Sequence, residues 1–203
     1  MSLARECGPY AVGFAIAAVV AGVLVHPLAS VPLVLLLAFT LWFFRDPERS
    51  PPADPGLLVS PADGKVIVAG AGRVSIFMNV FDVHVCRSPA AGEIVSVDRA
   101  RGGFLAAYRD AASEQNERVK LVVNGSARVG FTLVAGVVAR RIVCKVAPGD
   151  RVARGQRIGL IQFGSRVDMD VPDGAELLVR VGDRATAGET PVARVGPVGH
   201  GRV

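Results

Sequence analysis

Hydrophobic and polar residues divide the chain into two different parts. Residues 7–44 contain no Asp, Glu, Lys or Arg, whereas the rest of the chain alternates short apolar runs with Gly-rich breaks. One bilayer crossing needs about 20 apolar residues, so the uncharged stretch predicts a transmembrane helical hairpin that turns at His26–Pro27. The alternative is a single span from Leu24 to Phe44. Arginines flank the stretch on both sides, which predicts that both of its ends lie in the cytoplasm.

The apolar runs after residue 55 are short and are separated by glycines, a pattern typical of β-strands. One segment differs, because Gly103–Arg118 has apolar residues at helical spacing. We therefore expect a mainly β (α+β) fold, with a barrel-sandwich-like antiparallel β domain over residues 56–203 and one or two helices. A Pro-rich linker over residues 45–55 joins this domain to the membrane anchor of residues 1–44.

The barrel-sandwich prediction comes from two similar turns. Gly149–Gly155 and Gly182–Gly188 both read G-D-R-x-x-x-G, a pattern similar to that of lipoyl and biotinyl carrier domains. Neither turn carries the Met-Lys pair of a carrier domain, so the pattern indicates architecture rather than carrier function. A membrane-tethered scaffold of this kind is the non-enzymatic alternative.

Composition narrows the partners that the chain is expected to bind. The formal net charge is +5, yet no basic block interleaved with aromatic residues is present, so anionic phospholipid is a simpler partner than nucleic acid. The three cysteines are odd in number and have no metal-ligand spacing. They favour a reducing compartment over a disulfide framework or a zinc site.

Three short segments carry candidate chemistry, although each alone is weak evidence. Ser165 follows Gly164, so its hydroxyl could attack the glycine carbonyl if a base and an oxyanion pocket were nearby. His84 shares a strand face with Asp82 and Cys86, and Asp63 precedes a glycine in a turn. A zinc peptidase is disfavoured, because His84 has no companion ligands at metal-binding spacing.

Taken in order, these segments resemble a known family. SPADGKV, FDVHVCRSP and FGSRVD, after an apolar N-terminus that ends in FFRDPER, are similar to the short bacterial and archaeal form of phosphatidylserine decarboxylase over nearly the whole chain. The resemblance implies self-cleavage between Gly164 and Ser165 into a β chain of residues 1–164 and an α chain of residues 165–203, which stay together as a heterodimer. It also implies a pyruvoyl cofactor made from Ser165.

The resemblance further implies an activity and a location. Phosphatidylserine would be decarboxylated to phosphatidylethanolamine through a Schiff base with the pyruvoyl group, as a step of phospholipid biosynthesis. The expected partners are phosphatidylserine and membrane phospholipid, and higher oligomers are an alternative to a single heterodimer. We expect the protein in the inner membrane, with its catalytic domain facing the cytoplasm and with no metal.

The same resemblance suggests roles for single residues. His84 would be the general base and Asp63 the acid that orients it, with Asp82 as the alternative orienting acid. Longer members of the family often carry a second histidine where this chain has Arg87, so His84 would serve both self-cleavage and decarboxylation, or one of them. Arg166 would either meet the lipid phosphate or be a solvated arginine at a strand end.

Overall fold

The computed structural model describes residues 2–103, 115–136, 141–162 and 165–196. The chain forms two compact units, Met1–Glu48 and Arg49–Val203. The first is mainly helical and the second is built of strands.

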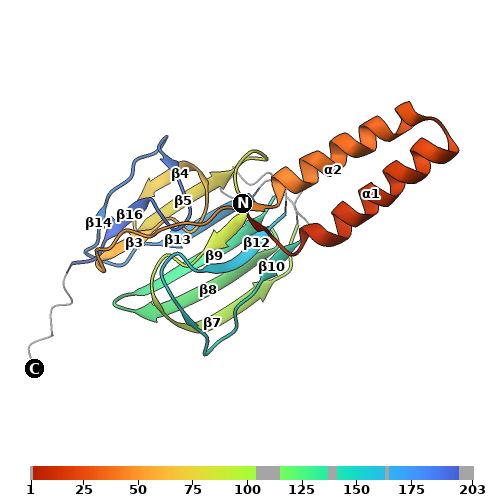
Figure 1. Cartoon of the computed structure of the whole chain (residues 1–203). Coiled ribbons are helices and arrows are strands. Elements are labelled where there is room, and N and C mark those ends of the chain that lie inside the picture. Colours follow the sequence, from red (N-terminus) through yellow and green to blue (C-terminus); the bar gives the residue numbers. More distant parts are fainter. Residues whose placement is uncertain (1, 104–114, 137–140, 163–164, 197–203) are drawn as a thin grey trace, which may run out of the picture. The chain divides into compact units, whose positions relative to one another are not determined.

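The first unit contains two apolar helices that pack side by side (Figure 1). Strands β1 (Ser2–Leu3) and β2 (Arg45–Asp46) pair at its base, and the helices are α1 (Cys7–Leu24) and α2 (Val31–Phe43), joined through the 3-10 turn η1 (Pro27–Ser30). The turn begins where the sequence predicts it, because the imidazole of His26 accepts a hydrogen bond from the Leu28 N–H at 3.2 Å.

Only α1, among the described residues, is long and apolar enough to cross a membrane. Most of its side chains are exposed, and only Cys7 and Ala18 are buried. With 13 residues, α2 is shorter than the roughly 20 residues that one crossing needs. The hairpin shape is therefore present, whereas its passage through a membrane stays a prediction.

The second unit contains an eight-stranded antiparallel sheet in the order β11-β7-β8-β9-β13-β5-β4-β15, and two three-stranded sheets, β10-β12-β6 and β14-β16-β3 (Figure 1). The predicted mainly antiparallel β domain is confirmed. The bounds of its strands are β3 (Leu57–Val59), β4 (Gly64–Gly70), β5 (Arg73–Met78), β6 (Val85–Arg87), β7 (Gly92–Ala100), β8 (Arg118–Gly125), β9 (Arg128–Ala135), β10 (Ile142–Cys144), β11 (Arg151–Val152), β12 (Arg157–Ile161), β13 (Ser165–Asp170), β14 (Glu176–Leu177), β15 (Arg184–Ala185) and β16 (Pro191–Arg194).

The strand order of the large sheet is symmetric about the β9–β13 pair. Counting outward from its centre, β9, β8, β7 and β11 on one side match β13, β5, β4 and β15 on the other. The small sheets match in the same way, with β3 equivalent to β6, β14 to β10 and β16 to β12. The domain thus consists of two similar halves, one made of β3–β5 with β13–β16 and the other of β6–β12.

A pair of glycines marks the approximate twofold axis that relates these halves. Gly155 and Gly188 hold the same place in the two G-D-R-x-x-x-G turns, with φ angles of 76° and 77°. They also touch each other, since a Cβ on Gly188 would lie 3.3 Å from the Cα of Gly155. Equivalent residues that contact each other must lie at the symmetry axis. Residues with a side chain rarely adopt this positive φ, and an added Cβ would lie 2.6 Å from Pro51 Cγ at Gly155 and 2.9 Å from Arg87 Cδ at Gly188, which explains the repeated glycine.

One apolar core fills the second unit, with residues from both halves. Its fully buried members include Val66, Ile76, Ile94, Val123 and Phe131. They come from alternating positions of neighbouring strands, as expected for sheets with one buried face.

The predicted helix over Gly103–Arg118 lies mostly outside the described residues, which omit 104–114. Where its ends are described, Gly103 forms a parallel bridge with Asn116, and Arg118 is the first residue of β8. The helix prediction was therefore wrong at Arg118, because that residue pairs with Val134 of β9 instead of continuing a helix.

Candidate active site

Ser165 is the first residue of β13 and is fully buried. It pairs with Met78, the last residue of β5, and with Ala135, the last residue of β9. Its hydroxyl donates to the thioether sulfur of Met78 at 3.2 Å. A thioether is a weak acceptor, so this contact costs little to break if the hydroxyl turns toward another group. Gly164 lies outside the described residues.

Asp63 lies at the same end of the large sheet as Ser165. Lys65 of β4 pairs with Phe77 of β5, and Met78, the next residue of β5, pairs with Ser165. The S-P-A-D-G turn that precedes β4 is therefore two strands away from the start of β13.

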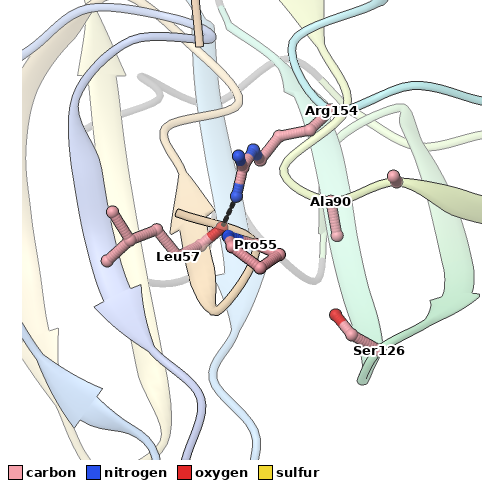
Figure 2. Close-up of a pocket in the computed structure, with 6 residues that line it drawn as sticks. Pro55, Leu57, Ala90, Ser126 and Arg154 are labelled. Atoms are coloured by element: carbon pink, nitrogen blue, oxygen red, sulfur yellow. Dashed lines mark hydrogen bonds between the residues drawn. The ribbon is translucent and has the colours of Figure 1, made fainter. Parts of the chain in front are cut away.

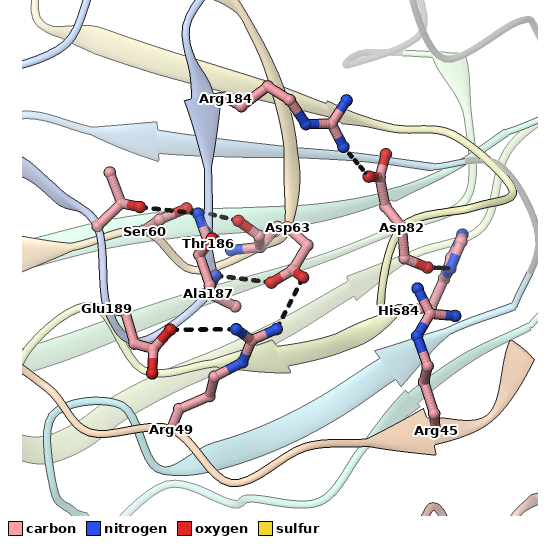
Figure 3. Close-up of polar contacts among 12 residues, drawn as sticks. Arg45, Arg49, Ser60, Asp63, Asp82, His84, Arg184, Thr186, Ala187 and Glu189 are labelled. Atoms are coloured by element: carbon pink, nitrogen blue, oxygen red, sulfur yellow. Dashed lines mark hydrogen bonds and ion pairs between the residues drawn. The ribbon is translucent and has the colours of Figure 1, made fainter. Parts of the chain in front are cut away.

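Both oxygens of the Asp63 carboxylate accept hydrogen bonds (Figure 3). Oδ1 accepts from the backbone N–H of Ala187 at 2.7 Å. Oδ2 accepts from the guanidinium of Arg49 at 2.9 Å. The side chain of Asp63 is 14% exposed and that of Arg49 is 16% exposed, so the ion pair is partly shielded from water and is stronger than a surface pair.

His84 is fully buried in the segment between β5 and β6. Its Nδ1 lies 2.9 Å from the carbonyl oxygen of Asp82 (Figure 3). A carbonyl can only accept, so Nδ1 carries the proton, and in the neutral ring Nε2 is the nitrogen that can take up another. The His84 carbonyl accepts from the N–H of Ile161 at 3.2 Å. His84 is thereby attached to the end of β12, four residues before Ser165.

The carboxylate of Asp82, the alternative orienting acid, is engaged elsewhere. It forms an ion pair with Arg184 (Figure 3) and accepts a hydrogen bond from the backbone N–H of Asn79 at 2.9 Å. Asp82 meets His84 through its backbone carbonyl. Its side chain therefore fixes the turn that carries the imidazole.

Cys86 and Arg87, which follow His84, have structural roles. Burial raises the pKa of the Cys86 thiol, and the negative charge of Asp63 raises it further, so the thiol stays neutral and is a poor nucleophile. The Arg87 guanidinium donates to the Gly155 carbonyl at 2.9 Å. The residue at the place of the second histidine thus stabilises the contact between the two glycine turns.

Arg166 is not a solvated arginine at a strand end, because it is 1% exposed. Its Nε donates to the carboxylate of Asp168 at 2.5 Å, and its Nη2 donates to the hydroxyl of Ser75 at 3.0 Å. Asp168 and Ser75 are directly paired across β13 and β5. The alternation of Arg166 and Asp168 with the core residues Val167 and Met169 is visible in the sequence, but the cross-strand partner Ser75 is not.

The sequence did not indicate a role in the site for Arg49 or Glu189. Arg49 counted only among the arginines that flank the uncharged stretch, yet its guanidinium bridges Asp63 and Glu189, with an N–O distance of 3.1 Å to the latter (Figure 3). Glu189 lies 140 residues away along the chain, so no local pattern could have indicated this contact. Among the described residues, no group of three or more His, Cys, Asp or Glu side chains could hold a metal ion.

Comparison with known proteins identifies the family. The sequence model of phosphatidylserine decarboxylase matches residues 36–73 and 68–193. The chain belongs to the phosphatidylserine decarboxylase family.

Curated relatives agree with this assignment over almost their whole length. The phosphatidylserine decarboxylase proenzyme of Symbiobacterium thermophilum is 47% identical over 206 residues, covering 95% of each chain. The proenzyme of Solibacter usitatus is 48% identical over 190 residues, covering 91% of this chain and 93% of the relative. The predicted family and the predicted enzyme class, a decarboxylase, are confirmed, and the word proenzyme describes relatives that require processing.

Proposed function

We propose that this decarboxylase cuts its own chain between Gly164 and Ser165 and then converts phosphatidylserine to phosphatidylethanolamine. The observation that carries the proposal is the position of Ser165. It is buried at the start of β13, at the sheet end that also holds Asp63, and His84 is hydrogen-bonded to the strand that leads into the cleavage point.

The residues suggest how the self-cleavage proceeds. Nε2 of His84 takes the hydroxyl proton of Ser165 while Oγ attacks the Gly164 carbonyl carbon, and the proton passes to the leaving nitrogen. Asp63 stabilises the resulting imidazolium. The peptide becomes an ester, elimination releases residues 1–164 as a carboxylate, and hydrolysis of the remaining dehydroalanine releases ammonia and leaves a keto group at position 165.

A pyruvoyl group fits this position. Ser165 is buried and pairs with Met78 and Ala135 on the neighbouring strands, and replacing its side chain with an uncharged keto group places no new charge at this position. When present, such a group supplies a ketone that binds the substrate amine and withdraws the electrons freed as CO2 leaves. His84 would then hold or deliver a proton close to the same carbon.

We also propose that the first unit anchors the enzyme to the inner membrane, with the β domain on the cytoplasmic side. This rests on the exposed apolar side chains of α1, among them Val12, Ile16, Val19 and Val23, and on the arginines that flank the uncharged stretch. Such an anchor would keep the active site close to a lipid substrate.

The test is to express the full chain and measure intact mass after denaturing electrophoresis. We expect two fragments, with a smaller one of residues 165–203 that starts with a pyruvoyl group and lacks a free amine. Ser165→Ala should remain one chain without decarboxylase activity, and His84→Ala should be processed far more slowly. Ser126→Ala is the matched control, because Ser126 also follows a glycine and should be processed normally. An active wild-type enzyme with an intact Gly164–Ser165 bond would refute the proposal.

A further inference from the structure

The two halves of the β domain begin with the same sequence pattern. Residues 60–64 read S-P-A-D-G before β4, and residues 88–92 read S-P-A-A-G before β7. The turns also share their hydrogen bonds. Ser60 Oγ donates to the Ala62 carbonyl at 2.6 Å, and Ser88 Oγ donates to the Ala90 carbonyl at 2.7 Å.

The G-D-R-x-x-x-G segment pairs with the strand that follows the S-P-A-x-G turn in the same way in both halves. Val66 N–H donates to the Asp183 carbonyl, as Ile94 N–H does to the Asp150 carbonyl, at 2.8 and 2.9 Å. Strand β15 pairs with the first residues of β4, as β11 does with the first residues of β7. The equivalence therefore extends to single residues, and each residue of the two turns beside Asp63 has a counterpart in the other half.

The charged residues around Asp63 do not follow this symmetry. The counterpart of Asp63 is Ala91, and the counterpart of Glu189 is Gln156. Gln156 accepts a hydrogen bond from the N–H of Ala153 at 2.9 Å within its own turn. The half that lacks Ser165 thus forms the same two turns without either carboxylate.

A cavity of about 240 Å³ lies beside the counterpart turn, lined by Pro55, Leu57, Ala90, Ala91, Ser126 and Arg154 (Figure 2). The guanidinium of Arg154, which lines this cavity, donates to the Leu57 carbonyl at 2.8 Å. It therefore binds a backbone carbonyl here, whereas Arg49 binds the carboxylate of Asp63. The S-P-A-x-G turn consequently needs neither an acid nor an acid-bound arginine to fold. The ion triad Arg49–Asp63–Glu189 is an addition specific to the catalytic half.

We propose that Arg49 is a positioning residue for the Asp63 carboxylate. Its guanidinium uses Nη2 for Asp63 and Nη1 for Glu189, and the planar fork fixes both directions at once. The backbone N–H of Ser50 donates to the other Glu189 oxygen at 3.2 Å, which holds the far end of the triad. With the Ala187 N–H on Oδ1 and the Arg49 guanidinium on Oδ2, the Asp63 carboxylate is held in one orientation. This inference rests on the proposed self-cleavage.

The experiment compares the rate of precursor conversion in full-length variants, followed by denaturing electrophoresis, together with the melting temperature of each precursor. Arg49→Gln should slow conversion roughly 10-fold or more, since small misplacements of catalytic groups carry penalties of this size. Arg49→Lys should recover part of the rate, because an ammonium can still hold Asp63. Arg194→Gln is the matched control. Arg194 also binds an aspartate, Asp54, at 2.7 Å, and its loss should leave the rate unchanged.

The outcomes separate this role from a structural one and from the proposed function. Slow conversion in Arg49→Gln, with a melting temperature like that of Arg194→Gln and a faster Arg49→Lys, supports the positioning role. A wild-type rate in Arg49→Gln overturns it, as does a lysine variant that is no faster than the glutamine variant. The positioning role is also overturned if Arg49→Gln and Arg49→Lys slow conversion only to the extent that each lowers the melting temperature. If the wild-type chain itself is not cut at Gly164–Ser165, the proposed function fails before any variant is compared.

Discussion

Removing the carboxylate of Asp168 should destabilise the β domain strongly, because it takes away a negative charge that pairs with a buried guanidinium. Arg166 is 1% exposed, and the side chain of Asp168 is 7% exposed. The loss of one member of a buried ion pair costs about 3–5 kcal/mol. The hydrogen bond from Arg166 to the Ser75 hydroxyl brings no negative charge, so it does not replace the lost carboxylate.

The change in the free energy of unfolding can be measured by urea unfolding in mild detergent, with the far-ultraviolet circular dichroism of the β-sheet as the readout. The Asp168→Ala variant and the reference chain should both carry Ser165→Ala, so that the chain stays in one piece and unfolding is unimolecular. With a denaturant dependence of about 2 kcal/mol per M for a domain of this size, Asp168→Ala should lower the midpoint by about 2 M.

A control on the same strand tests the reasoning. Asp170 belongs to β13 and pairs with Lys120 at 3.6 Å, but the two side chains are 54% and 52% exposed. Exposed pairs contribute about 0–1 kcal/mol, so Asp170→Ala should move the midpoint only slightly. Equal shifts for Asp168→Ala and Asp170→Ala would refute the claim that burial of the pair determines its importance. A double replacement, Arg166→Met with Asp168→Leu, should recover most of the loss, because neither charge of the pair is then buried.

Two further predictions concern single residues of the β domain. Because the pKa of the Cys86 thiol is raised in the folded state, Cys86 should resist alkylation at pH 8 and react only after unfolding, whereas the less buried Cys144 should react in the folded protein. The contribution of the neutral Cys86 thiol to the stability of the fold should be complete below pH about 8.5 and should fall as the pH rises further. Gly64→Ala should destabilise the fold by at least about 1–3 kcal/mol, because the added Cβ would lie 2.1 Å from the Phe77 carbonyl oxygen and the φ of this residue is +151°. Gly196→Ala, with open space around the added Cβ, should leave the melting temperature unchanged. Alkylation of Cys86 in the folded protein, or equal melting temperatures for the two glycine variants, would contradict these expectations.

The strands were predictable from sequence, whereas their pairing was not. Apolar runs with glycine breaks located β4, β7 and β12, because a half-buried strand must alternate its side chains. The placement of β13 between β9 and β5 depends on contacts almost 90 residues apart, such as Ser165 with Met78. No local preference of the chain specifies such a contact.

The internal symmetry could have been predicted from the sequence more fully. The G-D-R-x-x-x-G repeat indicated two similar turns, but S-P-A-x-G also occurs twice, at residues 60–64 and 88–92. Two repeats that recur in pairs predict two similar halves. Arg49 could not have been assigned in this way, because its partners are side chains that only the folded chain brings together.

The symmetry also separates what the fold requires from what the chemistry requires. Where both halves carry the same residue, as with Gly64 and Gly92, the backbone geometry explains it, since a Cβ at either position would lie within 2.3 Å of a carbonyl oxygen. Where the halves differ, as with Asp63 and Ala91, the same turn forms around both residues, so the fold does not demand the acid. Substituting Asp63 with the residue found at its counterpart therefore removes a candidate catalytic group and leaves the turn intact. A loss of self-cleavage in such a variant can be assigned to chemistry rather than to misfolding.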